Sequence, residues 1–173
     1  MNERFAKNYE LNNMKKKSWT DKLFDSKDLP KVVELNEKGS VHWGGQTMVI
    51  PRPLDVFNLM AQVPEGKVTT ITEIRKALAK KYKTDIACPL TTGIFSTISA
   101  RASEENNDPS KLPKIPYWRT LKSSGEINEK FPGGVEVLSG KLKAEGFEVI
   151  HKGKKAKVKD YEKYLFHSDD FEL

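Results

Sequence analysis

The stretch I-P-Y-W-R-T, residues 115–120, holds the side chains that are best suited to bind a ligand in this sequence. Tyr117 and Trp118 offer two flat rings that could stack on a nucleic-acid base or fill a protein interface. Arg119 could donate hydrogen bonds to a phosphate. The two rings supply no strong nucleophile, because an unperturbed phenol has a pKa of about 10 and an indole cannot accept a proton. We therefore expect binding without covalent chemistry at this stretch.

Other reactive side chains are few. Cys88 is the single cysteine, and its apolar neighbours in I-A-C-P-L are typical of an inert, partly buried thiol. An enzyme that uses Cys88 is the weaker alternative. The three histidines, His42, His151 and His167, lack the spacing of metal ligands, so we expect neither a metal site nor a cofactor.

The composition indicates one ordinary domain with appendages. The chain has 173 residues and a formal net charge of +6, which suits a polyanionic partner such as nucleic acid. No apolar run reaches the length of a membrane span or of a signal-peptide core. We expect a cytoplasmic protein without membrane contact, and double-stranded DNA is its candidate partner.

Two amphipathic helices are predicted at the start of the domain. Pro53 suits the first position of one helix, and Thr70 to Glu73 form a capping-box pattern for the next, in which Glu73 would reach back to Thr70. The predicted inward side chains are Val56, Leu59, Met60 and Val63 in the first helix and Ile74, Ala77 and Leu78 in the second.

A third helix is predicted from Pro89, and its two faces differ in an unusual way. The predicted inward stripe consists of Ile94, Ile98 and Ala102. The opposite face carries the short hydroxyl side chains Thr92, Ser96, Ser99 and Ser103. Short side chains would let a DNA backbone approach closely, and hydroxyls can donate to phosphate oxygens. In the alternative, this face packs under the N-terminal segment, and the hydroxyls bond to the carbonyls of their own helix.

The predicted fold class is α+β, mainly α: a winged helix-turn-helix with a small β wing and a C-terminal β-hairpin. We expect the wing at 117–127, a last helix closed at Glu145 and Gly146, and a hairpin with Lys155, Lys157 and Lys159 on one face. The predicted divisions are a flexible basic arm (1–17), a wrapping segment that begins with a helix capped by Ser18 (18–52), the winged-helix domain (53–150), and a hairpin and tail (151–173).

Four motifs occur in order within residues 53–150. They are V-P-E-G-K-V-T-T at 63–70, T-T-G at 91–93, I-P-Y-W-R-T at 115–120 and F-P-G-G-V-E-V-L-S-G-K-L-K-A-E-G at 131–146. Together they resemble the DNA-binding domain of the methylated-DNA-protein-cysteine methyltransferases, also called alkylguanine-DNA alkyltransferases. The resemblance leaves the N-terminal arm and the C-terminal tail outside it.

The resemblance also implies which chemistry is missing. In that family the loop reads Pro-Cys-His-Arg, and its cysteine accepts an alkyl group from a flipped-out guanine. This chain keeps Pro116 and Arg119 but has Tyr117 at the cysteine position and Trp118 at the histidine position. It is therefore most similar to the alkyltransferase-like proteins, which lack the cysteine and bind damaged DNA without repairing it. The resemblance implies a non-catalytic sensor of modified or alkylated bases, with Tyr117 beside an extruded base.

A candidate set of DNA contacts follows from the residues and the resemblance together. Leu90 stands where the family inserts an arginine into the base stack, and Ile71 stands at the position of a tyrosine that presses on the flipped nucleotide's phosphate. The full set is Thr92, Gly93, Ser96, Tyr117, Trp118, Arg119, Lys122, Leu90, Lys67 and Arg101. The alternative is a protein-interaction module of the same fold that no longer binds DNA, in which Tyr117 and Trp118 are packed or contact a protein partner.

Overall fold

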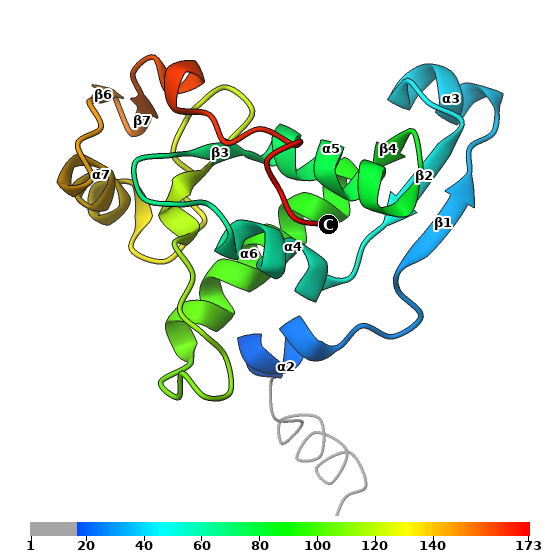
Figure 1. The fold of residues 1–173 in the computed structure, drawn as a ribbon, viewed down its shortest axis with the longest axis horizontal. Coiled ribbons are helices and arrows are strands. Elements are labelled where there is room, and N and C mark those ends of the chain that lie inside the picture. Colours follow the sequence, from blue (N-terminus) through cyan, green and yellow to red (C-terminus); the bar gives the residue numbers. More distant parts are fainter. Residues whose placement is uncertain (1–16) are drawn as a thin grey trace, which may run out of the picture.

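The computed structural model describes residues 17–173 and shows a helical body with a smaller lobe at each end (Figure 1). The helices are α2 (Trp19–Phe24), α3 (Glu37–Trp43), α4 (Pro53–Ala61), α5 (Ile71–Tyr82), α6 (Pro89–Glu105) and α7 (Gly134–Ala144). The strands are β1 (Lys31–Glu34), β2 (Thr47–Ile50), β3 (Thr69–Thr70), β4 (Ile86–Ala87), β5 (Thr120–Leu121), β6 (Val149–Lys152) and β7 (Lys155–Val158). The fold is thus mixed α and β. Most of the predicted basic arm, residues 1–16, lies outside the described part of the chain.

The helices α4 and α5 begin where the sequence predicts them. Pro53 is the first residue of α4, and the Thr70 hydroxyl accepts a hydrogen bond from the Glu73 amide at 3.3 Å at the start of α5. The predicted inward side chains of both helices are buried, namely Val56, Leu59, Met60, Val63, Ile74, Ala77 and Leu78. The other half of the predicted capping box is wrong, because the Glu73 carboxylate bonds elsewhere.

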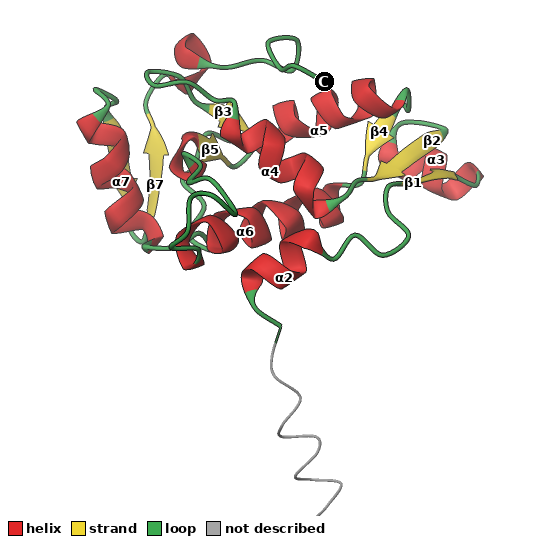
Figure 2. Cartoon of the chain, turned by 60° about the horizontal axis from the view of Figure 1, so that its bottom comes forward, coloured by secondary structure: helices red, strands yellow, loops and turns green. Residues whose placement is uncertain are grey.

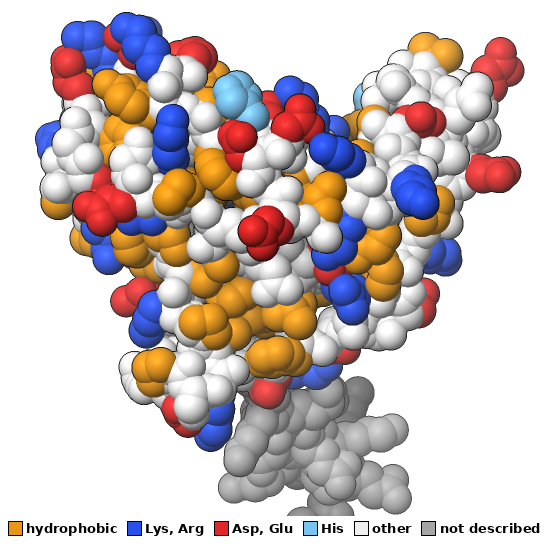
Figure 3. Space-filling model, viewed as in Figure 1, with side chains coloured by type: hydrophobic (Ala, Val, Ile, Leu, Met, Phe, Trp, Pro, Cys, Tyr) orange, Lys and Arg blue, Asp and Glu red, His pale blue; other side chains and the backbone are white. Residues whose placement is uncertain are grey.

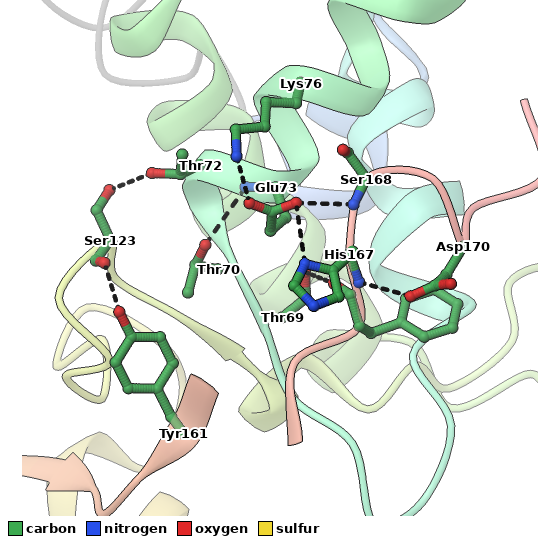
Figure 4. Close-up of polar contacts among 11 residues, drawn as sticks. Thr69, Thr70, Thr72, Glu73, Lys76, Ser123, Tyr161, His167, Ser168 and Asp170 are labelled. Atoms are coloured by element: carbon green, nitrogen blue, oxygen red, sulfur yellow. Dashed lines mark hydrogen bonds and ion pairs between the residues drawn. The ribbon is translucent and has the colours of Figure 1, made fainter. Parts of the chain in front are cut away.

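That carboxylate ties the C-terminal tail to α5 (Figure 4). Glu73 is 5% exposed and accepts hydrogen bonds from the Ser168 amide at 2.7 Å and from Lys76 Nζ at 2.8 Å. Burial acts to raise the pKa of Glu73, but these two bonds and the neighbouring positive charge of Lys76 together hold the pKa below its usual value. Phe166 continues the attachment, because its amide donates to the Val68 carbonyl at 2.7 Å.

The N-terminal segment, predicted only to wrap the core, contributes two strands to a three-stranded sheet. Strand β1 pairs antiparallel with β2, and β2 pairs parallel with β4, which follows α5. The predicted helix cap at Ser18 is confirmed, and Leu23 of α2 is fully buried in the core. Phe24, the last residue of α2, is 52% exposed. Between the two lobes, hydrophobic side chains gather over the helical body (Figure 3).

The segment predicted as a β wing, residues 117–127, pairs with distant strands. Strand β5 pairs parallel with β3, and the turn that follows closes when the Lys122 amide donates to the Glu126 carbonyl at 2.8 Å. After the turn, the Ile127 amide donates to the Ala156 carbonyl of β7 at 2.8 Å. The turn was predicted at the right place, but its partners lie 51 and 29 residues away, and no local pattern specifies them.

The C-terminal lobe contains the helix and the hairpin that the sequence predicts. Leu138 and Leu142 of α7 are buried in the core. Strands β6 and β7 form the predicted hairpin, in which Ala156 and Val158 face inward and the intervening lysines face outward. None of the helices in residues 17–173 combines the length and the apolar character that a membrane crossing requires.

Candidate functional site

Tyr117, the residue at the centre of the I-P-Y-W-R-T stretch, belongs to the hydrophobic core. It lies in a short 3₁₀ turn, η1 (Tyr117–Arg119), and is 3% exposed. Its ring meets Phe131 edge to face at a centroid distance of 6.1 Å, and its hydroxyl donates to the Glu104 carboxylate at 3.1 Å. A side chain packed in this way has no surface to offer to an extruded base, so the predicted stacking role of Tyr117 does not fit its position.

The environment of Tyr117 also works against nucleophilic chemistry. Burial, together with the neighbouring Glu104 carboxylate, raises the pKa of the phenol well above its usual value. The phenol therefore stays protonated at neutral pH, and a protonated phenol is a weak nucleophile.

Arg119 and Trp118 are held by one carboxylate of the following helix. Arg119 donates to both oxygens of Glu145 through Nε, at 3.1 and 2.9 Å, and to the Val63 carbonyl through Nη1 at 2.7 Å. The Trp118 indole donates to the same carboxylate at 2.7 Å. The side chains of Arg119 and Glu145 are only 13% and 10% exposed. Arg119 is thus engaged in a nearly buried ion pair that joins η1 to the end of α7, and its predicted phosphate contact does not fit that position.

Helix α6 buries the face that was predicted to point outward. Thr92, Ser96, Ser99 and Ser103 are all buried. Of the predicted inward stripe, Ala102 is buried and Ile98 is partly buried, whereas Ile94 is 48% exposed. The prediction of an outward hydroxyl face was therefore wrong. The alternative is confirmed, because Thr92 donates to the Cys88 carbonyl at 2.7 Å and Ser99 donates to the Phe95 carbonyl at 2.8 Å.

These hydroxyls can be buried because each finds a hydrogen-bond partner inside the protein. A hydroxyl bonded to a carbonyl one turn earlier needs no water, and its small volume lets a neighbouring helix approach closely. Helices α2 and α4 both pack extensively against α6 (Figure 2). Bulkier isoleucine and leucine side chains are consequently displaced to the outer face, where Leu90 is 69% exposed.

A pocket of about 800 Å³ lies along this outer face. Four parts of the chain form it: α6, the first residue of α5, helix α2 and the segment 120–131. Its principal apolar side chains are Trp19, Ile71, Leu90, Ile94, Leu121 and Phe131. Such a lining suits a flat, apolar ring better than a fully hydrated ion.

Basic side chains line the same pocket. Lys22, Lys122 and Lys130 contribute three ammonium groups, and the one carboxylate in the lining, Glu129, pairs with Lys122. The pocket therefore carries excess positive charge beside its apolar lining. The Thr120 hydroxyl, also in the lining, is buried without a hydrogen-bond partner among residues 17–173.

The turn beside the pocket is fixed by side chains from two other segments (Figure 4). Thr72 of α5 donates to the Ser123 hydroxyl at 2.8 Å, and Tyr161 donates to the Ser123 carbonyl at 3.3 Å. Gly125 has a φ of +80°, and a Cβ there would collide with the Tyr161 ring, so only glycine fits this turn. These contacts hold the segment 120–131 against the start of α5.

Gly93 lies in the lining of the pocket, in the first half of α6. A Cβ at this position would meet no atom within 4 Å, and its φ lies outside the left-handed region. Neither packing nor backbone geometry therefore requires glycine here, although glycine inside a helix costs about 0.5 to 1 kcal/mol relative to alanine. An unoccupied Cβ position lets a ligand lie close to the α6 backbone.

The structure brings only part of the predicted contact set together. The pocket lining includes Leu90, Gly93, Ser96 and Lys122, although Ser96 is almost fully buried. Arg101 lies against Trp19 at the side of the pocket. The remaining predicted contacts do not line it, namely Lys67, Thr92, Tyr117, Trp118 and Arg119.

Sequence reasoning missed several lining residues. Trp19, Lys22 and Lys130 belonged to no motif with a functional role, and Phe131 was noted only as the first residue of the motif at 131–146. The spacing of Leu90 and Ile94 was the available signal, because residues four apart share a helix face. This spacing indicates an exposed apolar face only if the opposite face, with its small hydroxyl side chains, is placed in the core.

Cys88 precedes α6 and is partly buried, as predicted. In residues 17–173, no three histidine, cysteine, aspartate or glutamate side chains are grouped so that they could hold a metal ion.

Comparisons with known proteins give a limited result. No protein-family model matches the chain, and no significant match is found among curated proteins. Two solved structures are similar to it, each with 19% sequence identity, and each similarity covers 66% of this chain and 93% of the other. One is S. pombe Atl1 in complex with damaged DNA containing O6-carboxymethylguanine (TM-score 0.45), and the other is S. pombe ATL in complex with DNA (TM-score 0.43). Both neighbours are alkyltransferase-like proteins, the group that the motifs of residues 53–150 resemble.

Proposed function

We propose that this chain is a non-catalytic DNA-binding protein that holds an extruded, modified base in the pocket beside α6. The observation that carries the proposal is the pocket itself, which combines an apolar lining, three lysines and the exposed Leu90 at one helix face. In this proposal α5 and α6 act as a helix-turn-helix, and the turn that begins at Lys122 acts as the wing.

The dimensions and the chemistry of the pocket suit a nucleobase. Its volume of about 800 Å³ falls within the range of about 300 to 1,000 Å³ that is usual for small-molecule sites. Stacking of a base on an aromatic side chain contributes about 1 to 3 kcal/mol, and the partly exposed Trp19 offers such a ring in the lining. Bases that pair poorly are extruded at lower cost, which gives a preference for modified bases.

Leu90 supplies the means of extrusion in this proposal. Minor-groove proteins often insert an apolar side chain between base steps, and this insertion partly unstacks the duplex. A leucine that is 69% exposed in the first turn of α6 is placed to act as such a wedge. Gly93, three residues later, leaves room for the DNA strand to approach the helix backbone.

The protein would bind the base without removing its alkyl group. Tyr117 is a protonated, buried phenol, and Trp118 donates its only N–H to Glu145. Cys88 does not line the pocket. Recognition without repair corresponds to a sensor of damage.

Two substitutions at Gly93 test the proposal. Gly93→Phe places a ring in the pocket, whereas Gly93→Ala adds only a methyl group that meets no neighbouring atom. We expect Gly93→Phe to abolish the preference for a duplex with one O6-methylguanine over the plain duplex, and Gly93→Ala to retain it, as measured by fluorescence anisotropy. An unchanged preference in a folded Gly93→Phe protein would contradict the proposed site.

A protein-interaction module is the second candidate, and the exposed apolar pair Leu90 and Ile94 favours it. Apolar residues are enriched at the core of protein interfaces, and this pair would suit one. Binding of the plain duplex at low salt separates the candidates, because only the first predicts it. Absence of duplex binding would favour the module.

A further inference from the structure

Two cations share one tryptophan beside the pocket. Lys22 Nζ lies 3.9 Å from the centroid of the Trp19 ring, and the guanidinium carbon of Arg101 lies 5.0 Å from it. Both distances are within the range in which a ring attracts a cation. The ring therefore holds two like charges close together, where repulsion alone would separate them.

No described carboxylate neutralises this pair. Neither Lys22 nor Arg101 forms an ion pair within residues 17–173, and the exposed Lys130, whose carbonyl accepts a hydrogen bond from Arg101 at 3.1 Å, forms none either. That hydrogen bond engages one nitrogen of the Arg101 guanidinium and leaves others available. Fixed cations with unused donors are suited to bind an anion.

The helix that carries Trp19 is firmly placed. A capping box closes the start of α2, where the Ser18 hydroxyl accepts from the Asp21 amide at 2.9 Å. The amide and the hydroxyl of Thr20 both donate to the Glu105 carboxylate at the end of α6, at 3.0 and 3.2 Å. With Leu23 fully buried, α2 is fastened to α6, and so is the pair of cations.

We propose that Lys22 and Arg101 form a clamp for a backbone phosphate of the DNA strand that the pocket engages, with Trp19 as the positioning residue. This proposal rests on the proposed function in one respect: the clamp and the pocket would bind the same DNA duplex. Its location follows from α6: Arg101 is eleven residues after Leu90, about 16 Å along the helix at 1.5 Å per residue, or about five base-pair steps. The clamp thus extends the contact surface of α6 away from the wedge.

The occupant is a nucleic-acid backbone rather than an acidic peptide because the cations adjoin the apolar pocket. Trp19 and Lys22 line that pocket together with Leu90 and Ile94. A chain with a flat base and regularly spaced phosphates meets both features at once. An acidic peptide would meet only the cations.

The variant Lys22→Ala tests the clamp, and Lys38→Ala is its matched control. Lys38 is an exposed lysine on α3, in the lobe at one end of the molecule (Figure 1). The probes are a plain duplex and the same duplex with one O6-methylguanine, each long enough to extend beyond both ends of α6. Affinity is measured over a range of salt concentrations by fluorescence anisotropy, and thermal melts check that each variant is folded.

We expect Lys22→Ala to weaken binding of both duplexes by the same factor, about eightfold near 0.1 M salt, and to flatten the log-log salt slope by about 0.9, as for one lost phosphate contact. Trp19→Phe should give part of this loss through the looser placement of the cations. An affinity and slope equal to those of Lys38→Ala would overturn the clamp, and so would tighter binding by Lys22→Ala, which would mean that α2 covers the DNA surface. A wild-type protein without preference for the modified duplex would instead overturn the proposed function and leave the clamp intact.

Discussion

Tyr117 provides a test of whether the I-P-Y-W-R-T stretch is core or binding surface. Tyr117→Phe removes only the hydroxyl and its 3.1 Å bond to Glu104, whose carboxylate is exposed and regains water. We expect a loss of about 0.5 to 1.5 kcal/mol in the free energy of unfolding. Tyr117→Ala removes a ring that is 3% exposed and packed against Phe131, which should cost about 3 to 5 kcal/mol.

Urea denaturation measures both losses, and thermal melts should shift by about 2 to 4 °C for each kcal/mol in a chain of this size. Because Tyr117 does not line the pocket, the folded Tyr117→Phe protein should bind plain and modified duplexes as the wild type does. The reasoning would be refuted by a Tyr117→Ala protein of nearly wild-type stability. It would equally be refuted by a stable Tyr117→Phe protein that no longer distinguishes the two duplexes.

Three further predictions concern charge and reactivity. The pKa of Glu73 is lowered in the folded protein, so its stabilising effect should be complete above the ordinary value of 4.5 and lost as the pH falls through the folded pKa. Thermal melts of wild type and Glu73→Gln should therefore converge at acid pH, and a constant difference would contradict this. Arg119→Ala leaves the Glu145 carboxylate nearly buried and unpaired, so it should cost about 3 to 5 kcal/mol of stability in urea denaturation, and a loss below about 1 kcal/mol would contradict the structural role. We expect no transfer of the methyl group from O6-methylguanine DNA to the protein, so mass spectrometry after incubation should show an unmodified chain. A methyl adduct at Cys88 would contradict this expectation.

Local signals predicted the helices and the hairpin well. Pro53 and Thr70 mark helix starts through rules that depend on a few neighbouring residues, and the structure follows them. The short parallel pairs β2 with β4 and β3 with β5 were not predicted. Each involves two residues per strand and joins distant segments, so no periodicity marks it.

The faces of α6 could not be read from hydrophobicity, because its apolar residues are spread around the helix. The hydrophobicity of Ile94 favoured an inward position for its face of the helix. The face of α6 that packs closely against α2 and α4 instead requires small side chains. A hydroxyl that bonds to its own helix counts as polar in a sequence and behaves as a small apolar group in a core. Tertiary packing, which the sequence does not display, decided the orientation.

The candidate site was only partly predictable for a related reason. The motif that resembles a reactive loop directed attention to Tyr117, but this ring fills the core. The pocket instead combines residues as distant as Trp19 and Phe131, which meet only after α2 has packed on α6. The resemblance identified Leu90 as a candidate DNA contact, but only the structure shows that its side chain is exposed.

The wedge and the pocket are tested most directly by comparing wild type with Leu90→Ala on a plain duplex and on one with a single O6-methylguanine. Leu90 is 69% exposed, so its truncation should change stability by no more than about 0.5 kcal/mol. If a base stacks in the pocket, the wild type should favour the modified duplex by about 1 to 3 kcal/mol, or about 5- to 150-fold in Kd. Leu90→Ala should lose most of that preference because the gap left by the base is no longer filled. Equal affinity of the wild type for both duplexes, or an undiminished preference in Leu90→Ala, would contradict base extrusion into the pocket beside α6.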